Sequence, residues 1–497
     1  MNGYLERGAG VLMPVSSLPS SHGIGTFGKE AYAFVDSLKR ASQKYWQVLP
    51  LGPTSYGDSP YASFSAFAGN PYFIDLDYLC EEGLLKKEFI EGFNFGSDPE
   101  KVDYEALFNS RFEVLREAFK NSSHRDDPEF ARFTRENKSW LDDYALYMSC
   151  KESFGGLSWQ EWDEDIKTRR PAALKRFQSD LAEDIEFWKF VQFKFFCQWH
   201  ALKAYANENG ISIIGDIPIY VALDSADVWA NAGFFQLDEK LRPKKIAGVP
   251  PDAFSDLGQR WGNPLYDWKE LEKDDFKWWR ARMKASADLY DVIRIDHFIG
   301  IAKYYTIPAK FDDARIGKWV KGPGMKLIKA INESIGDAKI IAEDLGVEVP
   351  EAIKLLKKSG YPGMNVLIFA FDGSRDNGHL PFNADPNSVT YGGTHDNETL
   401  FGFFSSAQKW QLGYITEYLQ AWNDDIGGLI EKLFACAYES VSAVVIFQMQ
   451  DILKLGNEAR MNSPSTLGGN WQWRMKAGAF TDERIERLRY LCDIYGR

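Results

Sequence analysis

Apolar runs of strand type alternate with helix-like stretches along most of the chain. Eight such runs recur, at residues 8–17, 45–54, 211–222, 292–298, 339–345, 363–371, 388–396 and 443–451. Helix-like stretches separate most of them, among them residues 29–41, 324–335, 349–359 and 424–437. Parallel strands are buried on both faces and need a helical crossover between them. The alternation therefore predicts an α/β protein built as a (β/α)8 TIM barrel.

Two intervals between the predicted strands are too long for simple crossovers. Residues 55–205 are rich in charged, helix-favouring sequence and predict a helical subdomain between the second and third strands. Residues 223–290 are dense in Gly, Pro, Asp and Trp and predict long active-site loops between the third and fourth strands. No repeat or low-complexity linker divides the chain, so we expect residues 1–497 to form one catalytic unit with insertions.

Three of the strand-type runs end in or near a carboxylate: Asp296, Glu343 and Asp396. Parallel α/β folds place their chemistry at the carboxyl ends of the strands, so we expect these acids to meet at one end of the barrel. Glycosidic cleavage needs one acid to protonate the leaving oxygen and one carboxylate to attack or stabilise the anomeric carbon. A single acid more often caps a strand end or pairs with a base, but the three together favour carboxylate catalysis.

The neighbours of these acids add to the same hypothesis. Arg294 precedes Asp296 by two residues, so both side chains point to one side of the strand, and a cation there would keep the aspartate ionised. A structural salt bridge is the alternative. His297 and His395 adjoin two of the acids and suit recognition of sugar hydroxyls, whereas no HxH or HxxxH spacing indicates a metal site. Asp216 is a fourth candidate acid, although an Asp-x-Pro turn would explain it equally well.

Net charge and motif content narrow the range of partners. A net charge of −13 argues against nucleic acid and against a polyanionic substrate, and fits a neutral or cationic ligand better. The chain has no GxxxxGK[ST], no strand-linked GxGxxG and no GxSxG, so we expect no cofactor and no serine nucleophile. Loops at residues 56–72, 248–254 and 258–264 mix aromatic, small and polar residues, as sugar-binding loops do, although ordinary turns are the alternative.

Cysteine spacing and hydropathy predict a cytoplasmic protein. The five cysteines are scattered without CxxC spacing, which indicates reduced thiols rather than disulfides or a zinc site. The first residues lack a basic-then-apolar signal sequence. No run reaches the roughly 18 apolar residues that a membrane span needs, so we expect no membrane partner.

These motifs together resemble those of the 4-α-glucanotransferases (amylomaltases or disproportionating enzymes), which form glycoside hydrolase family 77 in the α-amylase clan. The resemblance covers about residues 8–474. Its most specific segments are residues 59–71, 248–254, 261–264, 294–298, 342–346 and 393–399. The Arg-x-Asp pair alone would indicate only the wider clan, whereas the Ser-Pro-Tyr and Pro-Pro-Asp loops indicate this family.

The resemblance implies a specific reaction and roles for individual residues. Asp296 is similar in position to the family's nucleophile, Glu343 to its general acid/base and Asp396 to its transition-state stabiliser. Substrate contacts are implied for Tyr61, Asp216, Asp252, Gln259, Trp261, Arg294, His297, His395 and Asn397. The implied donors are maltooligosaccharides, amylose or starch-derived glucans, glucose is an implied acceptor, and neither metal nor cofactor is implied.

A retaining double displacement makes two physical predictions. The carboxyl groups of Asp296 and Glu343 should lie about 5–5.5 Å apart. Like-charge repulsion from the other two acids should raise the pKa of Glu343. Two alternatives stay open: an α-1,4-glucan hydrolase of the same clan, and a non-catalytic glucan-binding protein on the same scaffold.

Overall fold

The eight apolar runs form one barrel of parallel strands. The computed structural model describes residues 5–55, 57–251, 255–346, 349–466 and 468–497. The strand order is β10-β11-β12-β1-β2-β3-β6-β9, and every neighbouring pair is parallel. The strands are β1 (Gly8–Leu12), β2 (Tyr45–Gln47), β3 (Ser212–Pro218), β6 (Val292–Asp296), β9 (Lys339–Ala342), β10 (Gly363–Val366), β11 (Ser388–Tyr391) and β12 (Val444–Gln448). The predicted TIM barrel is confirmed.

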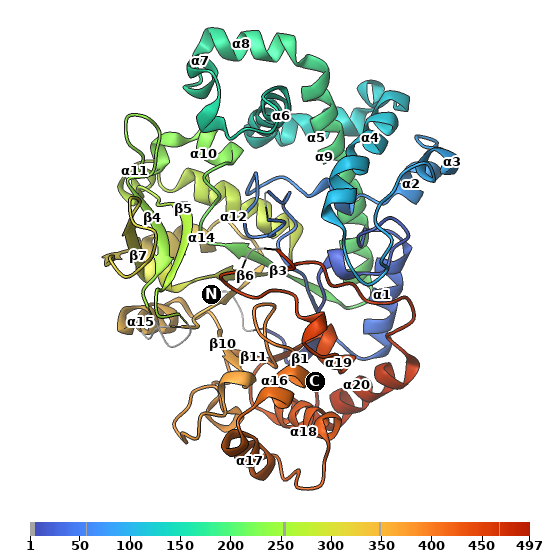
Figure 1. The fold of residues 1–497 in the computed structure, drawn as a ribbon, viewed down its shortest axis with the longest axis vertical. Helices are drawn as coiled ribbons and strands as arrows, with labels where there is room; N and C mark the ends of the chain where they lie inside the picture. Colours follow the sequence, from blue (N-terminus) through green and yellow to red (C-terminus); the bar gives the residue numbers. More distant parts are fainter. Residues whose placement is uncertain (1–4, 56, 252–254, 347–348, 467) are drawn as a thin grey trace.

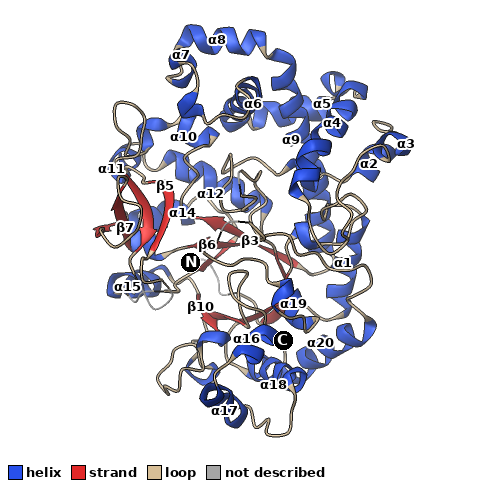
Figure 2. Ribbon diagram, in the orientation of Figure 1, coloured by secondary structure: helices blue, strands red, loops and turns tan. Residues whose placement is uncertain are grey.

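Burial on both faces explains why these runs are apolar throughout. Every residue of β1, β2, β11 and β12 is buried. The outer faces pack against surrounding helices, as Figures 1 and 2 show. These helices are α1 (Lys29–Arg40), α9 (Ala182–Glu208), α12 (Lys277–Leu289), α14 (Met325–Asn332), α15 (Pro350–Ser359), α16 (Leu400–Ser406), α17 (Lys409–Tyr418), α18 (Ile426–Glu439) and α20 (Asp482–Tyr495). The alternating period of the sequence thus reflects a layer of helices around a filled barrel.

The long interval between β2 and β3 is mainly helical, and its helices occupy the upper part of Figure 1. Before α9 it contains α2 (Leu76–Glu81), α3 (Lys87–Ile90), α4 (Tyr104–Asn121), α5 (Pro128–Glu136), α6 (Lys138–Ser153), α7 (Glu164–Lys167) and α8 (Pro171–Asp180). Helix α9 belongs to both the helical subdomain and the barrel. Its first half packs against α4, α5 and α6, and its second half leads into β3. Its aromatic core residues, such as Phe187 and Trp199, are fully buried.

The interval between β3 and β6 differs from its prediction as loops. It contains α10 (Ala226–Ala230), β4 (Lys245–Val249), β5 (Gln259–Pro264) and α11 (Trp268–Lys273), besides α12. After α13 (Ile299–Ala302), β7 (Lys303–Pro308) and β8 (Lys318–Lys321) complete a four-stranded antiparallel sheet in the order β5-β4-β7-β8. This sheet lies at the left of Figure 1. Strand β5 reads Gln-Arg-Trp-Gly-Asn-Pro, so only pairing with β4, and no local propensity, makes it a strand.

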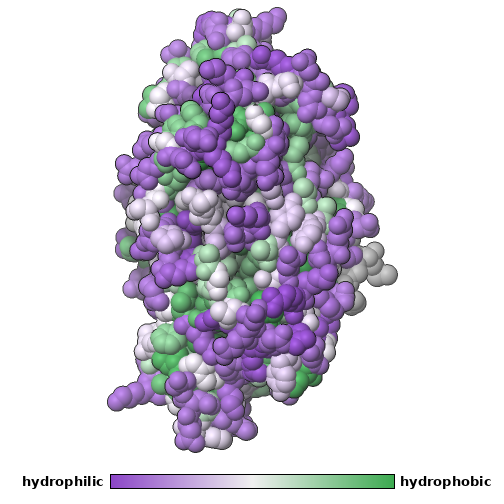
Figure 3. All heavy atoms as spheres, turned by 90° about the vertical axis from the view of Figure 1, so that its right-hand side faces the viewer, coloured by the Kyte–Doolittle hydropathy of each residue, from purple (hydrophilic) through white to green (hydrophobic). Residues whose placement is uncertain are grey.

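Hydrophilic residues cover most of the face drawn in Figure 3, with smaller hydrophobic patches between them. The large aromatic side chains of the core, including Trp46, Trp159 and Trp279, are shielded almost completely from solvent. Within the described ranges, no helix combines the length and the hydropathy needed to cross a membrane.

Candidate active site

Three of the four predicted acids lie on or directly after neighbouring barrel strands, and the fourth lies in a turn. Asp216 lies within β3, Asp296 is the last residue of β6, and Glu343 directly follows β9. These strands are adjacent in the order β3-β6-β9, so their side chains meet at one end of the barrel. Asp396 differs from its prediction as a strand end, because β11 ends at Tyr391 and the acid lies in the turn that follows. A pair of glycines, residues 392–393, starts that turn.

Arg294 connects two of these acids. Its Nη1 lies 2.5 Å from Asp216 Oδ2 and 3.2 Å from Asp296 Oδ1. The second contact is the one expected from the two-residue spacing along β6. Its Nε donates to the sulfur of Met364 at 3.4 Å. Burial raises the pKa of Asp296, and the guanidinium opposes this rise by favouring the charged form of the acid.

Tyr61 links this cluster to the turn after β11. Its hydroxyl donates to Asp216 Oδ2 at 2.7 Å and lies 3.4 Å from His395 Nδ1. The two rings are stacked, with centroids 5.0 Å apart. His395 Nε2 in turn lies 3.4 Å from Asp396 Oδ2. Burial lowers the pKa of His395, so its imidazole is neutral near pH 7, and a continuous polar network runs from Asp296 to Asp396.

Glu343 lies in a turn that both fixes and buries its carboxyl group. Oε2 accepts a hydrogen bond from the His297 amide at 2.7 Å, and Oε1 accepts one from the Leu345 amide at 2.8 Å. Burial raises the pKa of Glu343 to about 7. The rise agrees with the prediction, although burial, and not like-charge repulsion, is its largest cause. The adjacent Asp344 adds a like charge, and repulsion between Glu343 and Asp296 raises the pKa of Asp296.

Asp396 depends on a segment that the sequence did not connect with it. Asn462 Nδ2 donates to Asp396 Oδ1 at 2.6 Å, and Arg460 Nη2 donates to the backbone oxygen of Asp396 at 2.7 Å. The Asn462 amide also donates to the His395 carbonyl at 3.1 Å. These residues follow Asp396 by more than sixty positions, with α16 to α19 (the last being Met449–Ile452) in between. The only signal in the sequence is a short polar stretch at residues 460–466.

The other side of the site is formed by His297 and residues of β5. His297 has a left-handed backbone (φ 55°), and its buried Nε2 has no hydrogen-bond partner among the described residues. Burial lowers the pKa of His297 to about 4, so the ring is neutral. Trp261 meets this ring edge to face at 4.8 Å and remains 37 % exposed, while Gln259 Oε1 accepts its indole N–H at 3.0 Å. An unpaired buried nitrogen beside a half-exposed indole can serve a sugar hydroxyl.

The structure does not bring Asn397, one of the predicted substrate-binding residues, into this cluster. The Asn397 side-chain oxygen accepts hydrogen bonds from the amide and hydroxyl of Thr394, at 2.8 and 3.0 Å, and so stabilises its own turn. Asp252 lies outside the described residues. Trp471, which the sequence did not single out, packs near both Tyr61 and His395, with ring centroids 5.8 Å from each.

No group of three or more His, Cys, Asp or Glu in the described part of the chain is arranged to hold a metal ion. The carboxyl groups of Asp296 and Glu343 have different environments. Glu343 holds a proton up to near-neutral pH, while Asp296 contacts a fixed guanidinium. Two carboxyl groups with such different environments on neighbouring strands can act as an acid and a nucleophile on one glycosidic bond.

Comparison with known proteins gives one consistent family. A sequence model described as 4-alpha-glucanotransferase matches residues 13–480. The 4-alpha-glucanotransferase of Clostridium butyricum is 50 % identical over 487 residues, which are 98 % of this chain and all of that protein. That of Thermus thermophilus is 46 % identical over 99 % of both chains. A solved amylomaltase from Streptococcus agalactiae in complex with acarbose is 44 % identical, with a TM-score of 0.95 over 99 % of this chain and 100 % of the other.

Proposed function

The chain belongs to the 4-alpha-glucanotransferase family, and from this premise we propose that it moves a segment of an α-1,4-glucan onto the 4-hydroxyl of an acceptor glucose or maltooligosaccharide. One observation carries the proposal. A buried Glu343 whose pKa is raised to about 7 directly follows β9, the strand next to that of Asp296, and Asp296 contacts the Arg294 guanidinium. This pairing is what a retaining attack on a glycosidic bond requires.

The first half of the reaction forms a covalent glycosyl-enzyme. A carboxylate oxygen of Asp296 attacks the anomeric carbon, and the bond from that carbon to the glycosidic oxygen breaks. Protonated Glu343 donates its proton to that oxygen, so the leaving glucan departs as an alcohol. We propose that Asp396, which Asn462 and His395 contact, accepts hydrogen bonds from sugar hydroxyls as positive charge develops on the ring.

The second half transfers the glycosyl group. Glu343, now a carboxylate, takes the proton of the acceptor 4-hydroxyl, and the acceptor oxygen displaces Asp296 with a second inversion. The anomeric configuration is therefore retained. Tyr61, Asp216, Arg294, His297, His395, Asn397, Gln259, Trp261 and Asp252 are proposed to bind the substrate on either side of this bond. Water attack at this stage would give hydrolysis instead.

Maltotriose distinguishes transfer from the hydrolytic alternative. A transferase converts it into glucose and a series of longer oligomers, which chromatography resolves. A hydrolase of the same clan produces only shorter sugars. An absence of products longer than maltotriose would contradict the proposed function.

Replacement of the nucleophile tests the non-catalytic alternative. We expect Asp296→Ala to lower kcat for maltotriose roughly 10⁴-fold, because removal of a covalent nucleophile leaves only binding and electrostatic effects. Circular dichroism checks that the variant is folded. An Asp296→Ala variant as active as the parent would favour a glucan-binding protein contaminated by another enzyme.

The proposed substrates are maltooligosaccharides, amylose and starch-derived glucans, with glucose as an acceptor and no nucleic-acid or membrane partner. The acarbose complex of the related Streptococcus agalactiae enzyme supports a glucan-type ligand. The net charge of −13 supports a neutral ligand over a polyanion. We further propose a cytoplasmic location for a single catalytic unit. This is supported by five free cysteines, which suit a reducing compartment.

A further inference from the structure

The barrel has one seam at which the strand ladder is interrupted. The sheet order begins at β10 and ends at β9, and no ladder joins these two strands within the described ranges. Two hydrogen bonds bridge them instead. The Ala342 amide donates to the Pro362 carbonyl at 2.9 Å, and the Met364 amide donates to Asp344 Oδ1 at 2.9 Å. A side-chain carboxylate thus accepts an amide proton that a strand carbonyl takes elsewhere in a parallel sheet.

The carboxylate of Asp344 is held tightly against β10. A Cβ atom at Gly363 would lie only 2.7 and 3.0 Å from its two oxygens, so any larger residue at that position would displace it. Burial raises the pKa of Asp344, and the hydrogen bond from Met364 opposes that rise. The acid is half-buried, and its carboxylate packs directly against the backbone of β10.

The turn at residues 343–345 is tied to strands on both sides. Glu343 reaches toward β6, where its Oε2 accepts the His297 amide. Asp344, the next residue, reaches the opposite way, toward β10. Because the backbone between the two side chains is short, the position of one carboxylate constrains the other. Loss of the Asp344 contact would leave only the Ala342–Pro362 hydrogen bond, one residue before the Glu343 turn, to hold this segment to the β10 side.

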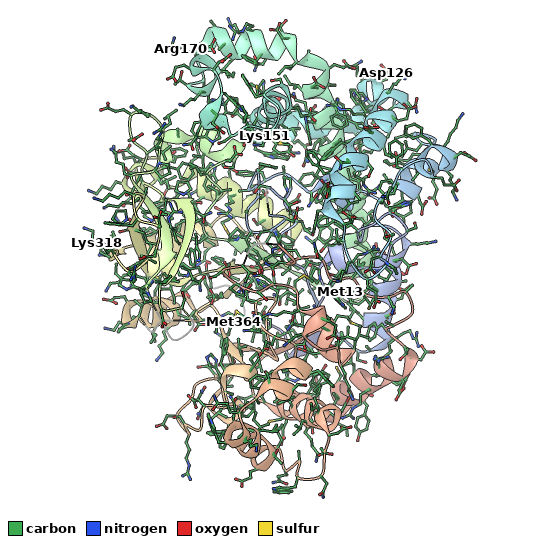
Figure 4. The ribbon with its side chains drawn as sticks, viewed as in Figure 1. Met13, Asp126, Lys151, Arg170, Lys318 and Met364 are labelled. Carbon is green, nitrogen blue, oxygen red and sulfur yellow. The ribbon has the colours of Figure 1, made fainter. Side chains whose placement is uncertain are left out.

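The contact also reaches the other catalytic carboxylate. Met364, labelled in Figure 4, lies on β10 in the central part of the molecule. Its sulfur accepts a hydrogen bond from Arg294 Nε at 3.4 Å, and Arg294 Nη1 contacts Asp296 at 3.2 Å. The Asp344 carboxylate holds the backbone of Met364, and the Met364 side chain supports the guanidinium behind Asp296.

We propose that Asp344 is a positioning residue of the active site, whose carboxylate closes the barrel seam and so fixes both the Glu343 turn and the Met364 side chain behind Arg294. This proposal rests on the proposed glycosyl-transfer reaction. The charged groups that act on Glu343 among the described residues are Arg294 and Asp296 from β6 and Asp344 from its own turn. The charge of Asp344 raises the pKa of Glu343.

Two substitutions separate the charge of Asp344 from its hydrogen bond. Asp344→Asn keeps an oxygen acceptor for the Met364 amide but removes the charge. We expect the alkaline limb of its kcat/KM profile to move to lower pH, because the general acid then loses its proton more easily. Asp344→Ala removes the acceptor as well. We expect it to shift the limb in the same direction and to lower kcat roughly tenfold to a hundredfold, with KM for maltotriose nearly unchanged.

Asp75→Ala is the matched control. Asp75 is buried where Asp344 is half-buried, and it likewise accepts a backbone amide, that of Tyr78 at 3.1 Å, but it caps α2 outside the catalytic machinery. We expect this variant to melt at a lower temperature with an unchanged pH limb. The proposal is overturned if Asp344→Ala lowers kcat no more than Asp75→Ala does and neither Asp344 variant moves the limb. Asp344→Asn keeps the test available if Asp344→Ala does not fold.

The same experiment separates this proposal from the proposed function. A parent enzyme that converts maltotriose only into shorter sugars contradicts glycosyl transfer. The comparison of pH limbs still tests the role of Asp344 in that case, because hydrolysis needs the same protonated Glu343.

Discussion

The active site has two halves that are held in place by different means. The strand half comprises residues on β3, β6 and the end of β9: Asp216, Arg294, Asp296 and Glu343. The loop half comprises residues from the loop after β2, the turn after β11 and the segment after α19: Tyr61, His395, Asp396 and Asn462. In the strand half, neighbouring backbones in one sheet set the distances. In the loop half, side-chain hydrogen bonds between remote segments do so.

The difference also appears in exposure and charge pairing. Arg294 and Asp216 are almost completely buried and paired at 2.5 Å. The Asp396 side chain is 43 % exposed, and its carboxylate is held by the neutral amide of Asn462. The groups proposed to exchange protons and form bonds thus lie on the rigid sheet, where small displacements are costly. Asp396, which is proposed to stabilise the positive charge that develops on the sugar, lies in the more exposed loop half.

The largest expected effect lies in the strand half. Arg294→Met leaves Asp216 buried without its cation, which we expect to lower the free energy of unfolding by about 3–5 kcal/mol. Without the guanidinium, the pKa of Asp296 should also rise further, which would lower kcat at neutral pH. Urea unfolding and maltotriose kinetics measure the two effects.

A double variant provides the control for this change. Adding Asp216→Asn to Arg294→Met removes the buried charge together with its partner, so part of the lost stability should return while the activity does not. If Arg294→Met unfolded at the same urea concentration as the parent, the strand half would not depend on this buried pairing.

A smaller effect should follow from the burial of Glu343. The folded chain holds its proton up to a pKa of about 7, above the unfolded value of 4.5, so this group makes folding less favourable as pH rises between those values. Glu343→Gln does not titrate. Its stability relative to the parent should therefore rise between about pH 4.5 and 7, by at most about 3 kcal/mol, on top of a pH-independent cost from its altered hydrogen bonds.

Denaturant titrations of both proteins at pH 5 and pH 8 measure that difference. The activity of the parent enzyme should show the same ionisation. We expect its kcat/KM to fall as pH rises through about 7, because Glu343 then loses its proton. A stability difference that stayed constant across the range would mean that Glu343 is ionised in the folded protein at both pH values.

The smallest expected effect lies in the loop half. Asn462→Ala removes the donor to Asp396 Oδ1, and we expect kcat for maltotriose to fall about tenfold, which corresponds to about 1.4 kcal/mol. Asn470→Ala is the matched control, because Asn470 accepts the Ser463 amide in the same segment without contacting the acid. Equal losses in both variants would indicate that only the order of the segment matters.

The strand half could be predicted from the sequence because its information is local. A run such as Val-Ile-Arg-Ile-Asp at residues 292–296 carries the strand, its burial and the shared side of Arg294 and Asp296 in five adjacent letters. Asp396 was recognised from its motif, but the sequence did not predict that it lies in a turn beyond β11. The four residues of β11 run directly into two glycines, so the sequence does not show where the strand ends.

The sequence by itself determined the barrel, the order of its strands along the chain and the identity of the acids, because periodic burial and motif spacing are properties of neighbouring residues. Only the tertiary structure decided that Asn462 holds Asp396, that β5 is a strand, and that Asp344 closes the seam beside Glu343. Each of these depends on a hydrogen bond to another segment. These hydrogen bonds form only when the whole chain packs, so a local pattern of residues does not predict them.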